Sequence, residues 1–207
     1  DSVDLVAERT HSVNTLRFDY DQAGRRKLTG YNTDVAGIVN AFADVGVTSA
    51  RHVAVIGGGA TASSAVVAAA ELGAEHISVI ARTPQKAFFL ETVGQEVGVN
   101  VTVHSLEHIG EISEVDVAIS TLPGDAELSL SPLPRTNRAT LLDVAYNPWP
   151  SSRGGEWAAS GGEVVSGLRM LAHQALIQVR IFVNGSPFEE VEHESVVKTA
   201  MFNAVNL

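Results

Sequence analysis

The stretch that decides the fold of this chain is VAVIGGGATA, residues 53–62. Its four apolar residues are typical of a strand, and three glycines lead from them into an alanine-rich segment typical of a helix. A strand that enters a helix through a glycine turn leaves backbone N–H groups unpaired at the positive end of the helix dipole. Because glycine has no Cβ, a phosphate can approach this backbone closely. The stretch therefore predicts a pyrophosphate-binding turn made of Gly57, Gly58, Gly59, Ala60, Thr61 and Ala62.

The residues after the next predicted strand indicate which dinucleotide would bind. That strand ends in Ala81-Arg82-Thr83, and Lys86 follows about one helical turn later. NAD sites usually carry an Asp or Glu here, which accepts hydrogen bonds from the ribose hydroxyls, whereas a cation suits a 2′-phosphate. We therefore expect NADP as the cofactor, with Ala81, Arg82, Thr83 and Lys86 around its adenosine. Two alternatives remain open, namely a tight turn that binds no ligand and an arginine that is only a solvated surface charge.

Apolar segments alternate with helical segments along most of the chain. Strands are predicted at residues 52–56, 76–80, 99–103, 115–120, 140–144 and 163–166. Helices are predicted at residues 34–45, 61–72, 167–183 and 188–203, and another after the second strand with Thr83 as cap and Pro84 in its first turn. Strands with so little polar alternation favour a parallel sheet that is covered on both faces. The predicted class is α/β, a Rossmann-like doubly wound parallel sheet, preceded by a hairpin of residues 12–18 and 27–31.

Composition excludes several classes of partner. The 207 residues carry a net charge of −10 with 14 Lys and Arg, which argues against binding to nucleic acid or an anionic membrane. No cysteine is present, and no apolar run is long enough to span a membrane, so we expect a soluble cytoplasmic protein. The seven histidines lack the spacing of a zinc site, and no metal is expected. The sequence does not choose between a monomer and a homodimer.

One segment resembles a known family. Gly30-Tyr31-Asn32-Thr33-Asp34, continued to Gly37, is similar to the G-x-N-T-D-x-x-G segment of the shikimate dehydrogenases. Further matches follow the family's order, and they are residues 12–15, the glycine turn, residues 81–83, residues 143–146 and residues 167–174. The resemblance implies an NADP-binding Rossmann domain at residues 34–166. It also implies a substrate domain, truncated here, that combines residues 1–33 with the C-terminal helices of residues 167–207.

The resemblance also implies roles for individual residues. Asp34 matches the catalytic aspartate that binds substrate hydroxyls, and Asn14 matches an asparagine that contacts the same hydroxyls. Gln174 matches a glutamine at the substrate ring, and Tyr146 a tyrosine near the substrate carboxylate. The backbones at Val144 and Gly167 match positions that meet the nicotinamide, and Thr121 is a further expected cofactor contact. Position 81 departs from the family, where asparagine is common before the arginine, and this puts one adenosine hydrogen bond in doubt.

Each of these residues also has a structural alternative. Asp34 could simply cap the N-terminus of a helix, since aspartate is a favoured capping residue. Gln174 could be a partly buried helix residue, and Tyr146 could pack on the end of the sheet. Asp34 alone would be a poor base at neutral pH, because the unperturbed pKa of an aspartate is about 3.9.

The implied activity is the reversible, NADPH-dependent reduction of 3-dehydroshikimate to shikimate in aromatic amino-acid biosynthesis. An NAD-dependent quinate or shikimate dehydrogenase is the first alternative. The second is a nucleotide-binding module without turnover, because the family's catalytic lysine and two carboxylate-binding serines lie upstream of the segment matched by Asn14. Lys27 lies after Asn14, in the predicted hairpin turn, and is not expected to replace that lysine. We therefore expect the chain to be a fragment.

Overall fold

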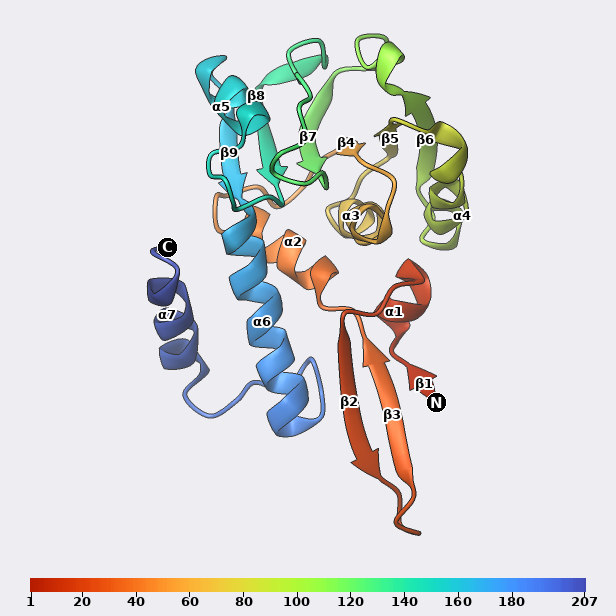
Figure 1. Cartoon of the computed structure of the whole chain (residues 1–207), viewed down its shortest axis with the longest axis vertical. Helices are drawn as coiled ribbons and strands as arrows, with labels where there is room; N and C mark the ends of the chain where they lie inside the picture. The colour runs from red at the N-terminus through yellow and green to blue at the C-terminus, as the bar shows by residue number, and fades with distance from the viewer.

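The computed structural model describes all 207 residues. A six-stranded sheet lies at the centre of its upper half (Figure 1). Its strands are β4 (His52–Ile56), β5 (His76–Ala81), β6 (Asn100–Ser105), β7 (Val115–Ser120), β8 (Arg135–Asp143) and β9 (Glu163–Ser166). They lie in the order β6-β5-β4-β7-β8-β9, and every neighbouring pair is parallel. The order reverses between β4 and β7, and ligands of such sheets bind outside the carboxyl ends of the strands at this point.

Both faces of this sheet are covered, as predicted. Val53 and Val55 of β4 belong to a core shared with α2 (Asp34–Ala43), α3 (Ala60–Glu71) and α4 (Phe89–Glu96). Ala54 and Ile56 point to the other face, whose smaller core includes Trp157 of α5 (Ser152–Ala159). The short 3₁₀ helix η2 (Leu106–His108) lies on this second face, where Leu106 packs against the core. The predicted class of doubly wound parallel sheet is confirmed.

A three-stranded sheet projects below the large one (Figure 1). Strands β2 (Thr15–Tyr20) and β3 (Arg26–Tyr31) form the predicted antiparallel hairpin, with Thr15 opposite Tyr31. The short β1 (Ser2–Val3) adds to β3 in parallel, and α1 (Leu5–Thr10) follows it. The sequence patterns did not predict either of these first two elements.

The last two helices lead the chain back toward the hairpin. Helix α6 (Gly167–Asn184) starts at the end of β9, packs along α2 and reaches β2, and α7 (Glu194–Ala204) packs on α6 (Figure 1). The hairpin, α2 and α6 therefore meet below the carboxyl edge of the large sheet. No helix combines the length and the apolar character that crossing a bilayer requires.

Several predicted boundaries are wrong, each for a local reason. After β5 the chain forms only a 3₁₀ turn, η1 (Pro84–Lys86), and Thr83 makes no side-chain cap bond. Helix α4 starts at Phe89 because Ala87 is buried against Gly58 and interrupts the turn. Strand β8 begins five residues early because a register shift opposite Val115 admits extra residues.

Two helices also have bounds that differ from the predicted ones. The final helix begins at Glu194 rather than at residue 188, since the Asn184 side chain binds the carbonyls of Glu189 and Glu190 and holds that stretch as a loop. Helix α2 ends at Ala43.

Candidate functional site

The glycine turn lies where β4 meets α3, and two of its glycines are required by the protein itself. Gly57 has φ 129°, a value that favours glycine, and a Cβ there would lie 2.1 Å from Thr121 Oγ1. A Cβ on Gly58 would lie 2.9 Å from the Cβ of Ala87. These two residues therefore let Ala87, which follows η1, and Thr121 in the loop after β7 pack directly against the turn.

Gly59 differs, because nothing in the protein requires glycine there. It precedes α3 with φ −104°, and a Cβ on it would meet no atom within 4 Å. The N–H groups of Ala60, Thr61 and Ala62 begin the helix and have no acceptor in a preceding turn. The turn therefore leaves open space beside unpaired N–H groups, as a bound pyrophosphate would need.

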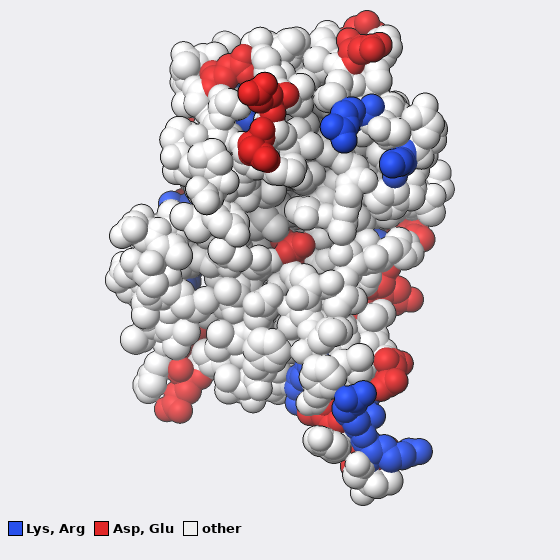
Figure 2. Space-filling model, viewed as in Figure 1, with Lys and Arg blue, Asp and Glu red and all other residues white.

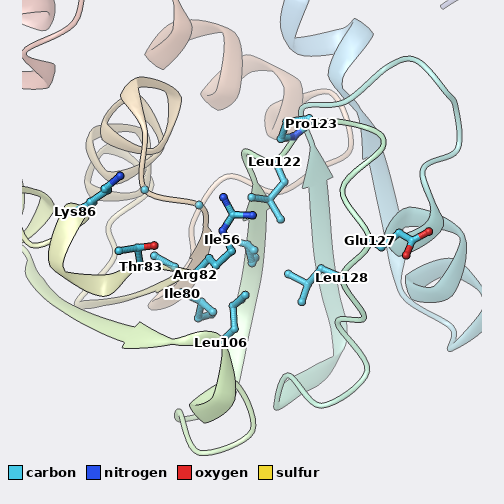
Figure 3. Close-up of a pocket in the computed structure, with 13 residues that line it drawn as sticks. Ile56, Ile80, Arg82, Thr83, Lys86, Leu106, Leu122, Pro123, Glu127 and Leu128 are labelled. Carbon is cyan, nitrogen blue, oxygen red and sulfur yellow. The ribbon is translucent and has the colours of Figure 1, made fainter.

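A pocket of about 390 Å³ lies beside this turn (Figure 3). Gly57, Gly58, Ala81, Arg82, Thr83 and Lys86 form one side of it. The Arg82 guanidinium extends from the end of β5 into the pocket, and Glu127 lies on the far side (Figure 3). Neither Arg82 nor Lys86 forms an ion pair, although most of the chain's other arginines do. Two free cations at a helix N-terminus suit an anionic ligand.

A second pocket of about 500 Å³ contains other predicted cofactor residues. Thr121 and Leu122 line one side of it, and Val144 and Tyr146 line the other. Tyr146 is 50% exposed and forms no hydrogen bond through its hydroxyl. Gly167 does not line this pocket but packs behind it, since a Cβ there would lie 2.0 Å from Val144 O. The structure thus explains Gly167 by close packing against Val144.

The predicted substrate residues Asn14, Asp34 and Gln174 come together as one polar cluster. Asn14 Nδ2 donates to Asp34 Oδ1 at 2.8 Å and to Gln174 Oε1 at 3.3 Å. It also lies 3.0 Å from Thr33 Oγ1, while Asn14 Oδ1 accepts from Thr33 N at 3.1 Å. Tyr146 shares no hydrogen bond with these residues. The structure therefore unites three of the four predicted substrate residues.

The carboxylate of Asp34 does not cap its helix. Asn32 takes that role, because its Oδ1 accepts from the backbone N–H groups of Asp34 at 3.0 Å and Val35 at 3.4 Å. Asp34 is the first residue of α2, and its side chain is free to face the cluster. Burial raises the pKa of Asp34 above its ordinary value, although the hydrogen bond from Asn14 opposes the shift. The capping alternative for Asp34 is wrong, and sequence reasoning missed Asn32, whose place two residues before the helix was the available signal.

Close helix packing brings Gln174 to this cluster. A Cβ on Gly37 of α2 would lie 2.9 Å from Met170 O and 3.1 Å from Gln174 Cβ. The bare backbone at Gly37 therefore lets α6 approach α2. This contact places the middle of α6, which follows the large sheet in the sequence, beside the first turn of α2.

No lysine pairs with Asp34. The chain has three lysines, Lys27, Lys86 and Lys198, and none forms an ion pair with this carboxylate. Lys27 lies opposite Asp19 toward the exposed end of the hairpin, where basic residues gather in Figure 2. It is therefore not a partner for Asp34, as the sequence indicated.

The apolar walls of the first pocket were not predicted. They come from Ile56, Ile80, Leu106, Leu122 and Leu128. Leucines in irregular segments carry no sequence pattern that would separate a pocket wall from ordinary packing. Only their position after a strand at the switch point could have drawn attention to them.

Known proteins resemble this chain over almost its whole length. No model of a protein family matches it. A shikimate dehydrogenase (NADP(+)) of Dehalococcoides mccartyi is 30% identical over 209 residues, which cover 94% of this chain and 70% of that protein. One of Methanothermobacter thermautotrophicus is 29% identical over 204 residues, covering 95% of this chain and 70% of the relative. The chain thus spans about 70% of the length of both relatives.

Solved structures agree with these relatives. The shikimate dehydrogenase of Mycobacterium tuberculosis has a TM-score of 0.77 and 33% identity, covering 99% of this chain and 72% of that one. The Thermus thermophilus enzyme, solved with NADP(H) and shikimate, has a TM-score of 0.72 and 26% identity, with the same coverage. A Corynebacterium glutamicum quinate dehydrogenase in complex with NAD shares the fold, with a TM-score of 0.79, 24% identity and coverage of 99% of this chain and 72% of that one. The chain therefore belongs to the shikimate dehydrogenase family.

Proposed function

We propose that this chain binds NADP(H) and forms part of a site for the reversible reduction of 3-dehydroshikimate to shikimate. The observation that carries the proposal is the pair of cations beside the glycine turn. Arg82 and Lys86 line the pocket without an ion-pair partner. Gly59 leaves open space beside the turn, which a bound phosphate could occupy and which a Cβ would otherwise fill. The residues present therefore fit a dinucleotide with an additional phosphate on its adenosine ribose.

The proposed binding mode divides the cofactor between the two pockets. Residues 57–62 hold the pyrophosphate through backbone N–H groups, and Arg82, Thr83 and Lys86 hold the 2′-phosphate, with Ala81 beside them. Thr121 and Val144 line the pocket proposed for the nicotinamide, with Gly167 behind Val144. When bound, NADPH supplies a hydride to the carbonyl carbon of the substrate.

The polar cluster is proposed to bind and orient the substrate. Asp34 accepts hydrogen bonds from substrate hydroxyls. Asn14 holds the carboxylate of Asp34 in place through the 2.8 Å hydrogen bond from its Nδ2 to Asp34 Oδ1. Gln174 contacts the substrate ring from α6, and Tyr146 lies toward the substrate carboxylate. In this arrangement residues 34–166 form the nucleotide domain, and residues 1–33 with residues 167–207 form the substrate side.

A second candidate, nucleotide binding without turnover, is favoured by the surroundings of Asp34. Alcohol oxidation needs a proton acceptor at the oxygen, and no lysine pairs with Asp34 to share that task. We therefore expect a protein of these 207 residues alone to turn shikimate over slowly or not at all. Because the chain spans about 70% of the length of its relatives, we also expect it to bind NADP weakly.

Equilibrium binding of NADP and NAD to the purified chain tests the proposal. NADP should bind at least about tenfold more tightly, because a charge-assisted contact to one phosphate contributes about 1.5–3 kcal/mol. Equal affinities would contradict the assignment. Rates with quinate and NAD that exceed those with shikimate and NADP would favour the NAD-dependent quinate dehydrogenase instead.

A further inference from the structure

We propose that Arg153 is a positioning residue, which holds the two walls of the second pocket at a fixed spacing. The walls are the segment Thr121–Gly124 and the segment Val144–Asn147. This inference rests on the proposed function, in which that pocket receives the nicotinamide half of NADP. Arg153 touches neither pocket itself, since its side chain is fully buried behind them.

The guanidinium of Arg153 bonds to the first wall once and to the residues on either side of it twice. Its Nε donates to the hydroxyl of Ser120, the last residue of β7, at 2.7 Å. Its Nη2 donates to the carbonyl of Leu122 at 2.9 Å, and its Nη1 to the carbonyl of Ala126 at 3.1 Å. Residues 121–134 between β7 and β8 contain no helix or strand, so their carbonyls lack partners in a ladder. Arg153 supplies donors for two of these carbonyls and thereby fixes the course of the loop.

The same guanidinium joins the second wall through Asp143. Arg153 Nη2 lies 2.9 Å from Asp143 Oδ1, and both side chains are completely buried. Asp143 ends β8 and directly precedes Val144, whose N–H binds Ser120 O. The carboxylate of Asp143 also accepts from the Ser151 hydroxyl and from Ala145 N at 3.3 Å. One buried cation therefore connects the residues immediately before both pocket walls.

Stability alone is a weak reason for such an arrangement. Taking an arginine and a carboxylate out of water is costly, and well-packed apolar residues of similar volume often serve as well or better. The fork of five N–H donors, however, can reach four acceptors on two chain segments, residues 120–126 and Asp143, in one fixed geometry. A binding pocket benefits from this order, because a preformed wall need not lose freedom when the ligand arrives.

The test compares two ligands that use the pockets differently. NADP spans both pockets, whereas 2′,5′-ADP lacks the nicotinamide half and occupies only the first, where the residues proposed for its phosphates are Gly57, Gly58, Arg82 and Lys86. The two pockets share only Leu122 and Pro123. In the variant Arg153→Lys a cation remains beside Asp143, but a single ammonium cannot reproduce the guanidinium fork. We expect its affinity for NADP to fall about tenfold in calorimetric titrations. Its affinity for 2′,5′-ADP should fall less, by about threefold at most, because that ligand meets only the shared residues Leu122 and Pro123 of the affected wall.

The matched control is Arg138→Lys. Arg138 is exposed, has no ion-pair partner and lies on β8 about 16 Å before Asp143, at about 3.3 Å per residue. Both of its affinities should equal those of the wild type. If Arg153→Lys fails to fold, the double variant Arg153→Met with Asp143→Asn removes both charges and avoids an unpaired buried carboxylate. The same loss for NADP and the same smaller loss for 2′,5′-ADP are expected.

The outcomes separate this inference from the proposed function. If the wild type binds neither ligand, the proposed function is wrong, and this inference falls with it. If the wild type binds both ligands, two results would overturn the inference while leaving the proposed function intact. The first is unchanged NADP affinity in the Arg153 variants, and the second is an equal loss for both ligands.

Discussion

Asn14 Nδ2 lies 2.8 Å from Asp34 Oδ1, so the residue that precedes the hairpin is hydrogen-bonded to the first residue of α2. The same amide group also lies within bonding distance of Thr33 Oγ1 and Gln174 Oε1. Two N–H groups face three acceptors, which leaves acceptor capacity for a hydroxyl donor. This relationship underlies the proposed substrate site, in which Asp34 accepts from substrate hydroxyls.

The half-buried carboxylate of Asp34 should make the protein less stable at neutral pH. Because burial raises its pKa in the folded state, the folded protein holds this proton at pH values where the unfolded chain has released it. Stability from this group is therefore lost as pH rises above the unfolded value of about 3.9. Asp34→Asn keeps the acceptor for Asn14 and has no charge. It should melt at a higher temperature than the wild type at pH 7, and the difference should vanish below about pH 4.

Asp21→Asn provides a control of opposite sign. Backbone and side-chain hydrogen bonds from Arg25 lower the pKa of this partly exposed aspartate. Its contribution is thus present at neutral pH and is lost as pH falls through the lowered folded value, so the variant should melt slightly lower at pH 7. An Asp34→Asn protein that melts at or below the wild-type temperature at pH 7 would show that Asp34 is not destabilising.

The contact between α2 and α6 should depend on Gly37. Its alanine variant places a Cβ 2.9 Å from Met170 O, so the helices must separate and the free energy of unfolding should fall by about 1–3 kcal/mol. Gly155→Ala on α5 meets no atom within 4 Å and should be neutral or stabilise the protein by up to about 1 kcal/mol. Urea denaturation measures both values. Equal stability of the two variants would mean that α6 does not require the bare backbone at Gly37.

The glycine turn offers a separation between folding and ligand binding. Gly59→Ala meets open space at a φ that alanine adopts, so its melting temperature should match the wild type. Its affinity for NADP should nevertheless fall by roughly tenfold, about 1.4 kcal/mol, because the Cβ occupies the path of the pyrophosphate. Gly57→Ala should instead lower the melting temperature, since it combines a φ of 129° with a clash against Thr121. Unchanged NADP affinity in Gly59→Ala would place the pyrophosphate elsewhere.

The periodic parts of the sequence predicted the large sheet well. The bounds of β7 and β9 agree with prediction because both strands are short apolar runs between turn residues. The prediction for β8 began too late, because its first residues are polar and no local pattern announces the register shift opposite Val115. Thr83-Pro84 has the composition of a helix start, yet Ala87 packs against Gly58 and allows only one turn. Tertiary contacts decided both cases.

The candidate site was predictable in its residues but not in its geometry. The glycines and Arg82 follow from local sequence, and the family resemblance indicated Asn14, Asp34 and Gln174. Asn14 and Gln174 lie 160 positions apart in the sequence. They form a hydrogen bond only because α6 approaches α2 closely at Gly37. Arg153 has no motif at all, and its role emerges only because the loop after β7 folds over it.

The most direct measurement of the central claim is the affinity of the Arg82→Ala variant for NADP and for NAD. Arg82 is proposed to bind the 2′-phosphate, so NADP affinity should fall about ten- to a hundredfold, or about 1.5–3 kcal/mol, while NAD affinity stays the same. Arg138→Ala, which removes an exposed and unpaired arginine elsewhere, should change neither value. A preference for NADP that survives in Arg82→Ala would contradict the account.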